Sequence, residues 1–109
     1  MPSFKIDTST ALVFVATAPE PKLANRKTGE VALDVVTEKP LYVVGLLVTD
    51  EGEGNLYKVA VPETGFPEGL VPGMPVRVTG LKAKDWENEF NGKKMHGISF
   101  RAVAITPAA

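Results

Sequence analysis

Glycine and proline interrupt this 109-residue chain along its whole length. Ten Gly and nine Pro are spread through it, and no window between them keeps the apolar spacing of an amphipathic helix. The apolar segments that remain are short and rich in valine, which favours β-strands. The sequence therefore predicts an all-β protein. Its length fits one domain, residues 1–109, with a single core.

Five main strands are expected, and a short strand-like segment at 31–36 leaves a sixth open. The run at 41–50 is the most apolar, and Gly45 in its middle predicts a bend or bulge of the kind that curls a sheet. The run at 10–17 is expected to be buried on both faces. Five curled antiparallel strands of this size are typical of the oligonucleotide-binding (OB) barrel. We predict such a five- to six-stranded barrel from segments 10–17, 41–50, 55–62, 75–81 and 97–107.

Two long excursions leave the predicted barrel. One is a hairpin or arm at about 19–40, and the other is a long hairpin at about 81–97. The connection 63–74 holds prolines that leave room for only one short helical turn. In the last strand, strict alternation places residues 98, 100, 102 and 104 on one side and residues 99, 101, 103 and 105 on the other.

Charge is unevenly distributed, although the net charge is only -1. Residues 41–76 contain one Lys against five carboxylates, whereas residues 77–101 contain six Lys and Arg against three. The net charge therefore neither predicts nor excludes a nucleic-acid partner, and the basic segment is where such a partner would bind.

Catalysis, metal binding and cofactor binding find no support in the sequence. The chain has no Cys and one histidine, His96, for which a plain surface role is the better interpretation. The acidic turn at 50–54 is too short for a calcium loop. No membrane-spanning run or targeting segment occurs, so we expect a complete cytoplasmic protein that is not an enzyme and has no membrane partner.

Residues 74–106 carry a family resemblance. The segment VRVTGLKAKDWENEFNGKKMHGISFRAVAI has a strand ending in Gly80, a basic stretch, Trp86, a polar loop with Gly92, and a final strand. In this order it resembles the late part of bacterial single-stranded DNA-binding proteins. The resemblance implies an OB barrel whose last hairpin contacts single-stranded DNA, and it covers a quarter to a third of the chain.

The rest of the chain departs from that family. The carboxy-terminal residues AITPAA lack its flexible linker and acidic tip, so recruitment of repair enzymes through a tail is in doubt. The arm at 19–40 resembles the small dimeric DNA-binding proteins of filamentous phages. Together the resemblances imply a role in replication, recombination or DNA maintenance, including that of a mobile element. They also imply a homodimer or homotetramer, for which Val103, Ile105 and segment 41–50 offer apolar surface.

Trp86 is the centre of the candidate site, because a single strand is bound by aromatic faces that stack on bases and cations that follow the phosphates. The charged neighbours Asp85 and Glu87 favour an exposed ring, and the alternative is a lid over the barrel. Phe90 is as well explained by a core role, and Tyr42 and Tyr57 by positions at the core edge. The predicted nucleic-acid-binding residues are Trp86, Lys82, Lys84, Lys93, Lys94, Arg101, Arg77, Phe90, Lys22, Arg26, Lys27, Lys39, Tyr42, Tyr57 and Lys58.

Two functions remain open on the sequence. The first is a sequence-tolerant single-stranded DNA-binding protein, with RNA as an alternative ligand. The second is a protein-interaction or regulatory OB module whose apolar strand faces bind a partner chain and whose lysines only keep it soluble.

Overall fold

The computed structural model describes residues 3–8, 10–25, 27–34 and 37–108, except for the side chains of Ser3, Asn88, Phe90 and Met95. The prediction of an all-β chain is confirmed. The one helical element among the described residues is a short 3-10 turn, η1 (Glu63–Gly65), in the connection whose prolines left room for one short turn. None of the helical structure in these ranges is long and apolar enough to cross a membrane.

One sheet contains most of the strands, in the spatial order β1-β8-β9-β6-β5-β2-β7-β10. A second, two-stranded sheet pairs β3 with β4. In chain order the strands are β1 (Ser3–Lys5), β2 (Leu12–Pro21), β3 (Leu23–Asn25), β4 (Glu30–Val31), β5 (Leu41–Asp50), β6 (Glu53–Pro62), β7 (Pro75–Thr79), β8 (Lys82–Phe90), β9 (Lys93–Arg101) and β10 (Ala104–Pro107).

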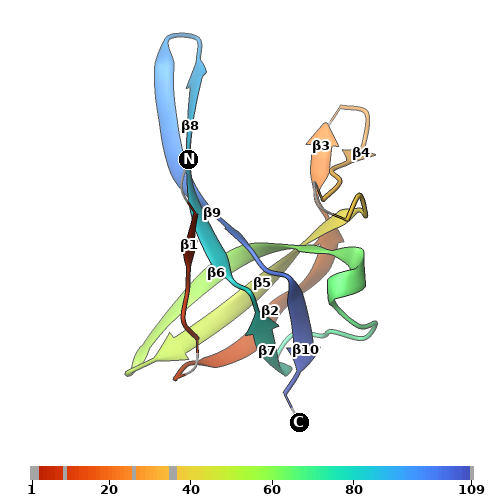
Figure 1. Cartoon of the computed structure of the whole chain (residues 1–109), viewed down its shortest axis with the longest axis vertical. Helices are drawn as coiled ribbons and strands as arrows, with labels where there is room; N and C mark the ends of the chain where they lie inside the picture. Colours follow the sequence, from red (N-terminus) through yellow and green to blue (C-terminus); the bar gives the residue numbers. More distant parts are fainter. Residues whose placement is uncertain (1–2, 9, 26, 35–36, 109) are drawn as a thin grey trace.

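The large sheet is strongly curled into a half-barrel (Figure 1). Strand β2 pairs with β5 along its length and with β7 at Val13 and Phe14. At the other side, β9 runs parallel to β6 over two residue pairs, and β10 pairs with β7. Only Ala102 and Val103 separate β9 from β10, and their N–H groups donate to the carbonyls of Ala60 and Thr79, each at 2.9 Å. The segment from β9 through Ala102 and Val103 to β10 therefore crosses from the edge of β6 to the edge of β7.

The core fills the inner face of the curled sheet. Along β5 and β6 the inward positions alternate with outward ones, as period-two burial requires. The alternation predicted for 56–61 is confirmed, with Val59 and Val61 fully buried and Leu56 and Lys58 exposed. The fully buried side chains are Leu46, Ile105, Val15, Val44, Val59 and Val61.

Two burial predictions were wrong. Segment 10–17 is fully buried on one face only: Val13 and Val15 lie in the core, whereas on the outer face Leu12 is 66% exposed and Phe14 is half-buried. Ile105 was expected on the outer side with Val103, but it is fully buried while Val103 is 62% exposed. The break at Ala102–Val103 interrupts the alternation, so the sides of the strand exchange beyond it.

Two hairpins project from the same end of the half-barrel (Figure 1). The longer one, β8–β9, is the hairpin expected at 81–97, and it closes through Asn91 and Gly92 with φ angles of 50° and 78°. Positive φ at both central residues matches a type I′ turn, which fits the twist of paired strands. The smaller one, β3–β4, belongs to the arm expected at about 19–40, and an isolated bridge joins Leu33 to Pro40 at its base.

A bulge was expected at Gly45, and the structure places it in β2, directly opposite Gly45. The register of β2 against β5 shifts between Val15 and Thr17, opposite Leu46 and Gly45, so β2 carries one extra residue. Gly45 N donates a hydrogen bond of 2.9 Å to Thr17 Oγ1. A Cβ on residue 45 would overlap with that same hydroxyl oxygen, so the close approach requires glycine.

Substitution of Gly45→Ala is expected to lower the free energy of unfolding by about 1–3 kcal/mol, because the added methyl group collides with Thr17 at the bulge. Equilibrium urea unfolding measures this. Gly54→Ala on the partner strand is the control, since its Cβ would meet neighbours no closer than 3.4 Å. When Thr17→Ala is already present, Gly45→Ala should lower the free energy of unfolding by less than it does alone. Equal stability of the Gly45→Ala and Gly54→Ala variants would show that the bulge does not depend on glycine.

Candidate nucleic-acid interface

The β8–β9 hairpin sorts its charges by face. In an antiparallel pair, directly opposed residues point to the same side, and successive residues alternate. The register runs from Lys82 opposite Arg101 to Phe90 opposite Lys93 without a shift. Lys82, Lys84 and Trp86 therefore share one face of the ribbon, at steps of about 7 Å along the strand.

We call this side the cationic face. Its described side chains include no carboxylate on β1, β8 or β9. The edge strand β1 adds a cation, because Lys5 lies opposite Lys82, which in turn lies opposite Arg101, so three cations form a row across three strands. The charged residues of the cationic face are Lys5, Lys82, Lys84, Lys93 and Arg101.

The other face of the hairpin is acidic. It carries Asp85, Glu87 and Glu89 at alternating positions of β8. Lys94, predicted as a phosphate contact, lies on this side directly opposite Glu89, and His96 lies opposite Glu87. Opposed charges of unlike sign support strand pairing. Lys94 is therefore set apart from the other lysines of the hairpin.

Trp86 lies on the cationic face, opposite Gly97. A Cβ built on Gly97 would stand 2.6 Å from Cζ2 and 2.8 Å from Cε2 of the indole, so the ring lies against the glycine backbone. Aromatic residues are known to cover glycine in paired strands in this way. The side chain is 38% exposed and does not belong to the core cluster. The indole thus has one supported side and an accessible remainder.

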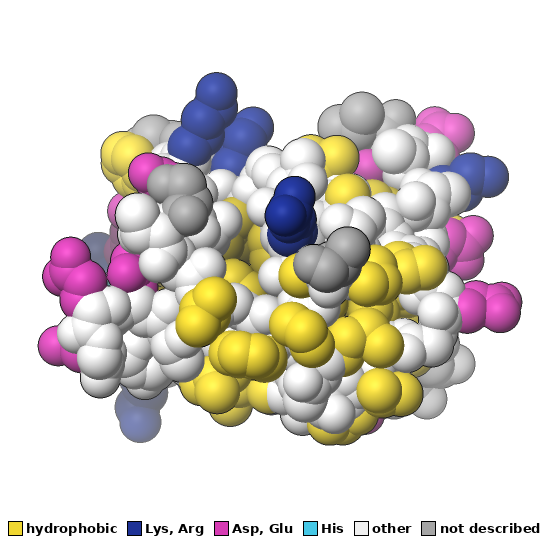
Figure 2. Space-filling view, turned by 90° about the horizontal axis from the view of Figure 1, so that it is seen from below, with side chains coloured by type: hydrophobic (Ala, Val, Ile, Leu, Met, Phe, Trp, Pro, Cys, Tyr) yellow, Lys and Arg dark blue, Asp and Glu magenta, His cyan; other side chains and the backbone are white. Residues whose placement is uncertain are grey.

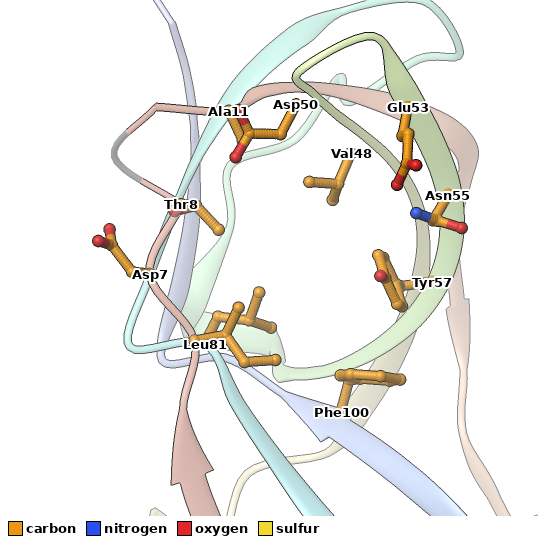
Figure 3. Close-up of a pocket in the computed structure, with 11 residues that line it drawn as sticks. Asp7, Thr8, Ala11, Val48, Asp50, Glu53, Asn55, Tyr57, Leu81 and Phe100 are labelled. Atoms are coloured by element: carbon orange, nitrogen blue, oxygen red, sulfur yellow. The ribbon is translucent and has the colours of Figure 1, made fainter.

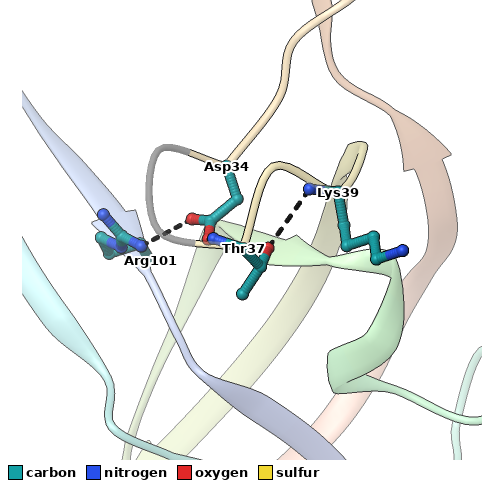
Figure 4. A network of polar contacts seen from close by, with 4 residues as sticks. All are labelled: Asp34, Thr37, Lys39 and Arg101. Atoms are coloured by element: carbon teal, nitrogen blue, oxygen red, sulfur yellow. Dashed lines mark hydrogen bonds and ion pairs between the residues drawn. The ribbon is translucent and has the colours of Figure 1, made fainter.

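Arg101 connects this hairpin to the base of the arm (Figure 4). Its guanidinium donates to Asp34 Oδ1 at 2.8 Å, and Asp34 is 3% exposed. Asp34 Oδ2 accepts hydrogen bonds from both the backbone N–H and the hydroxyl of Thr37, each at 2.9 Å. One oxygen of the carboxylate therefore fixes the loop through Thr37, and the other anchors β9 through Arg101. Arg101 serves this contact, although its side chain remains 47% exposed.

Comparison with family models, with curated proteins and with solved structures gave no match. The geometry of the side chains is therefore what bears on function.

The remaining predicted residues are not gathered on the cationic face. Tyr42 and Tyr57 are half-buried and pack edge-to-face against Phe66 and Phe100, at ring separations of 5.3 and 4.7 Å. Lys58 lies on the opposite, outer face of β6, so it does not share a groove with Tyr57.

Several other predicted cations are exposed at separate places. Arg77 lies on β7, which pairs with β2 and β10 rather than with the hairpin. Lys22, Lys27 and Lys39 are exposed along the arm. Arg26 and the side chain of Phe90 lie outside the described part of the chain.

Sequence reasoning missed Lys5, because the three-residue strand β1 has no recognisable pattern. The split of the hairpin into two faces did have a signal. An Asn-Gly pair between two strands predicts a two-residue turn, and a turn centred on 91–92 fixes every pair in the ribbon.

Removal of the Asp34 carboxylate should destabilise the protein. We expect Asp34→Ala to lower the free energy of unfolding by about 1–3 kcal/mol, because Thr37 and the half-exposed Arg101 lose their shared acceptor. Urea unfolding at equilibrium is the measurement. Glu30→Gln, an exposed carboxylate of the same arm, should change the midpoint little. Coinciding unfolding curves for Asp34→Ala and the unmodified chain would refute a structural role for the ion pair.

Proposed function

We propose that this protein binds single-stranded DNA without reading its sequence, through the cationic face of the β8–β9 hairpin. The observation that carries the proposal is the segregation of Lys82, Lys84, Lys93 and Trp86 on one side of the ribbon, with the carboxylates on the other. Each group supplies one of the two interactions that such binding needs: ammonium groups neutralise phosphates, and an indole stacks on a base.

The spacing of these groups suits an extended strand. Lysines two residues apart lie about 7 Å from each other, and the ribbon extends this row from β1 to the tip of the hairpin. Gly97 supports the indole from behind, so the ring is held in place before a base arrives and loses little entropy on stacking. Such an arrangement tolerates any base, because every base has a π-face.

We further propose that the half-barrel is an OB barrel. Its support is the pairing pattern: β2 contacts both β5 and β7, and the chain from β9 to β10 joins β6 to β7. In an OB barrel the loops that flank the sheet bind nucleic acid. The two projecting hairpins are such excursions. This fold assignment agrees with the single-stranded DNA-binding family that the segment 74–106 resembles, and with a role in replication, recombination or maintenance of DNA.

Titration with oligo(dT) at low salt should quench the emission of Trp86, the chain's single tryptophan, and added salt should reverse the quenching. The triple variant Lys82→Gln, Lys84→Gln, Lys93→Gln should reduce the slope of log K against log salt by about 2, since each lost phosphate contact on a single strand removes about 0.7. Trp86→Leu should weaken binding about 5- to 150-fold, the equivalent of one stacked base.

Lys94→Gln is the matched control, because Lys94 belongs to the same hairpin but to its acidic face. Its affinity and salt slope should stay close to those of the unmodified protein. Unchanged emission and no mobility shift at low salt would refute DNA binding. Competition between poly(dT), poly(U) and duplex DNA then separates the DNA proposal from RNA binding.

A second candidate function, a protein-interaction module, is favoured by a separate surface. Phe14, Leu47 and Leu56 are directly opposed in register on the outer face of β2, β5 and β6, and Leu47 and Leu56 are 38% and 61% exposed. Figure 2 shows hydrophobic side chains gathered on the end opposite the two hairpins as well. Exposed apolar areas of this kind mark interaction sites.

The outer row of Phe14, Leu47 and Leu56 also supports the proposal of a homodimer or homotetramer. Light scattering at micromolar concentration should then give a multiple of the 11.6 kDa chain mass. The double variant Leu47→Ser, Leu56→Ser should shift the protein toward monomer, because it removes the apolar contact area. Leu23→Ser is the control, because Leu23 is an exposed leucine of the arm, and it should leave the mass unchanged. A monomeric mass for the unmodified protein would contradict the proposal.

A further inference from the structure

A cavity of about 200 Å³ opens at the end of the half-barrel where β6 and β9 separate (Figure 3). The two strands pair only at Val59–Phe100 and Ala60–Arg101, so the first half of β6 has β5 as its partner on one side and the cavity on the other. Ile6, Asp7, Thr8, Ala11 and Leu81 complete the cavity.

The inner face of the β5–β6 hairpin changes character as it approaches this cavity. Deep in the barrel the opposed pairs are apolar, as in Val44 with Val59. Nearer the mouth, Val48 lies opposite Asn55, and at the mouth Asp50 lies opposite Glu53. Positions that alternation directs inward are thus occupied by two carboxylates.

Two like charges directly opposed across a strand pair are destabilising. Asp50 accepts a hydrogen bond from the Thr10 hydroxyl at 3.0 Å, which is a neutral donor and leaves the charge of the carboxylate in place. Asp7 also lines the cavity, although its carboxylate points away from the centre in Figure 3. Among the described residues that line the cavity, none is Lys or Arg. A cation placed between Asp50 and Glu53 would relieve their repulsion.

The floor of the cavity suits an organic cation rather than a hydrated metal ion. Tyr57 and Phe100 meet edge-to-face there, at a ring separation of 4.7 Å, and Ile6 and Leu81 add apolar surface. Aromatic rings attract a nearby cation through their π-electrons. A guanidinium group is planar, stacks on such rings, and offers five N–H donors to carboxylates at its edge.

We propose that this cavity binds a guanidinium group on an alkyl chain, with its plane on the Tyr57 ring, against which Phe100 packs edge-to-face, and its N–H groups toward Asp50 and Glu53. The volume decides the size of the ligand. Pockets for drug-sized molecules hold about 300–1,000 Å³, so 200 Å³ suits a group the size of one side chain. The negative lining excludes the phosphates that the cationic face attracts, so this site is independent of the proposed DNA binding.

The test is an NMR titration of the whole protein, following the signals of Tyr57 and Phe100. N-acetyl-arginine amide should shift these signals in a saturable way, whereas N-acetyl-citrulline amide, which has the same length and no charge, should bind at least tenfold more weakly. The double variant Asp50→Asn, Glu53→Gln should lose at least tenfold in affinity. Agmatine, tested in parallel, separates the sources: tighter binding of agmatine indicates a free small molecule, and tighter binding of the amide indicates an arginine side chain.

Glu51→Gln is the matched control, because Glu51 lies on the same turn but does not line the cavity. It should change the affinity less than twofold. The triple lysine variant of the cationic face should bind the arginine compound like the unmodified protein, even if DNA binding itself fails its own test. Equal shifts with the citrulline compound, or an equal loss in the Glu51→Gln variant, would overturn the proposal.

Discussion

The short parallel contact between β6 and β9 is the constraint on which the surrounding structure depends. It consists of only two residue pairs. It nevertheless fixes the point before which β9 belongs to the β8–β9 hairpin and after which the chain crosses to β10. Before this contact β9 is free to pair with β8 and to extend into the projecting hairpin. Beyond it, the N–H groups of Ala102 and Val103 secure the crossing to β7. A longer pairing would close the gap that forms the cavity.

Two adjacent residues at this contact belong to different sites. Phe100 points inward, packs against Tyr57 and forms part of the cavity floor. Arg101 points outward, lies on the cationic face and holds Asp34 at the base of the arm. Because neighbouring side chains of a strand point to opposite faces, one strand can separate an anionic cavity from a cationic surface. The two proposed ligands, single-stranded DNA and a guanidinium group, carry opposite charges and accordingly have separate binding sites.

Local patterns in the sequence predicted the parts of the fold that depend on neighbours in the chain. The bounds of the strand at 41–50, the alternation from Leu56 to Val61 and the bulge at Gly45 all follow from residue type and period. What depends on contacts between distant segments was not predictable. The pairing of β1 with β8, which brings in Lys5, has no local signal, and 67 residues separate Arg101 from Asp34. The burial of Ile105 required knowledge of the break at Ala102–Val103.

The two-faced charge of the β8–β9 hairpin has a consequence for how a polyanion approaches. Lys82, Lys84 and Lys93 on one side of a thin ribbon, against three carboxylates and one lysine on the other, give it a dipole across its width. The field of a nearby polyanion exerts a torque on such a dipole and turns the lysine side toward it before contact, and this orienting effect weakens as salt shortens the range of the field. A chain of nearly zero net charge can therefore still be oriented by a polyanion, and it avoids the indiscriminate attraction that a large positive charge brings.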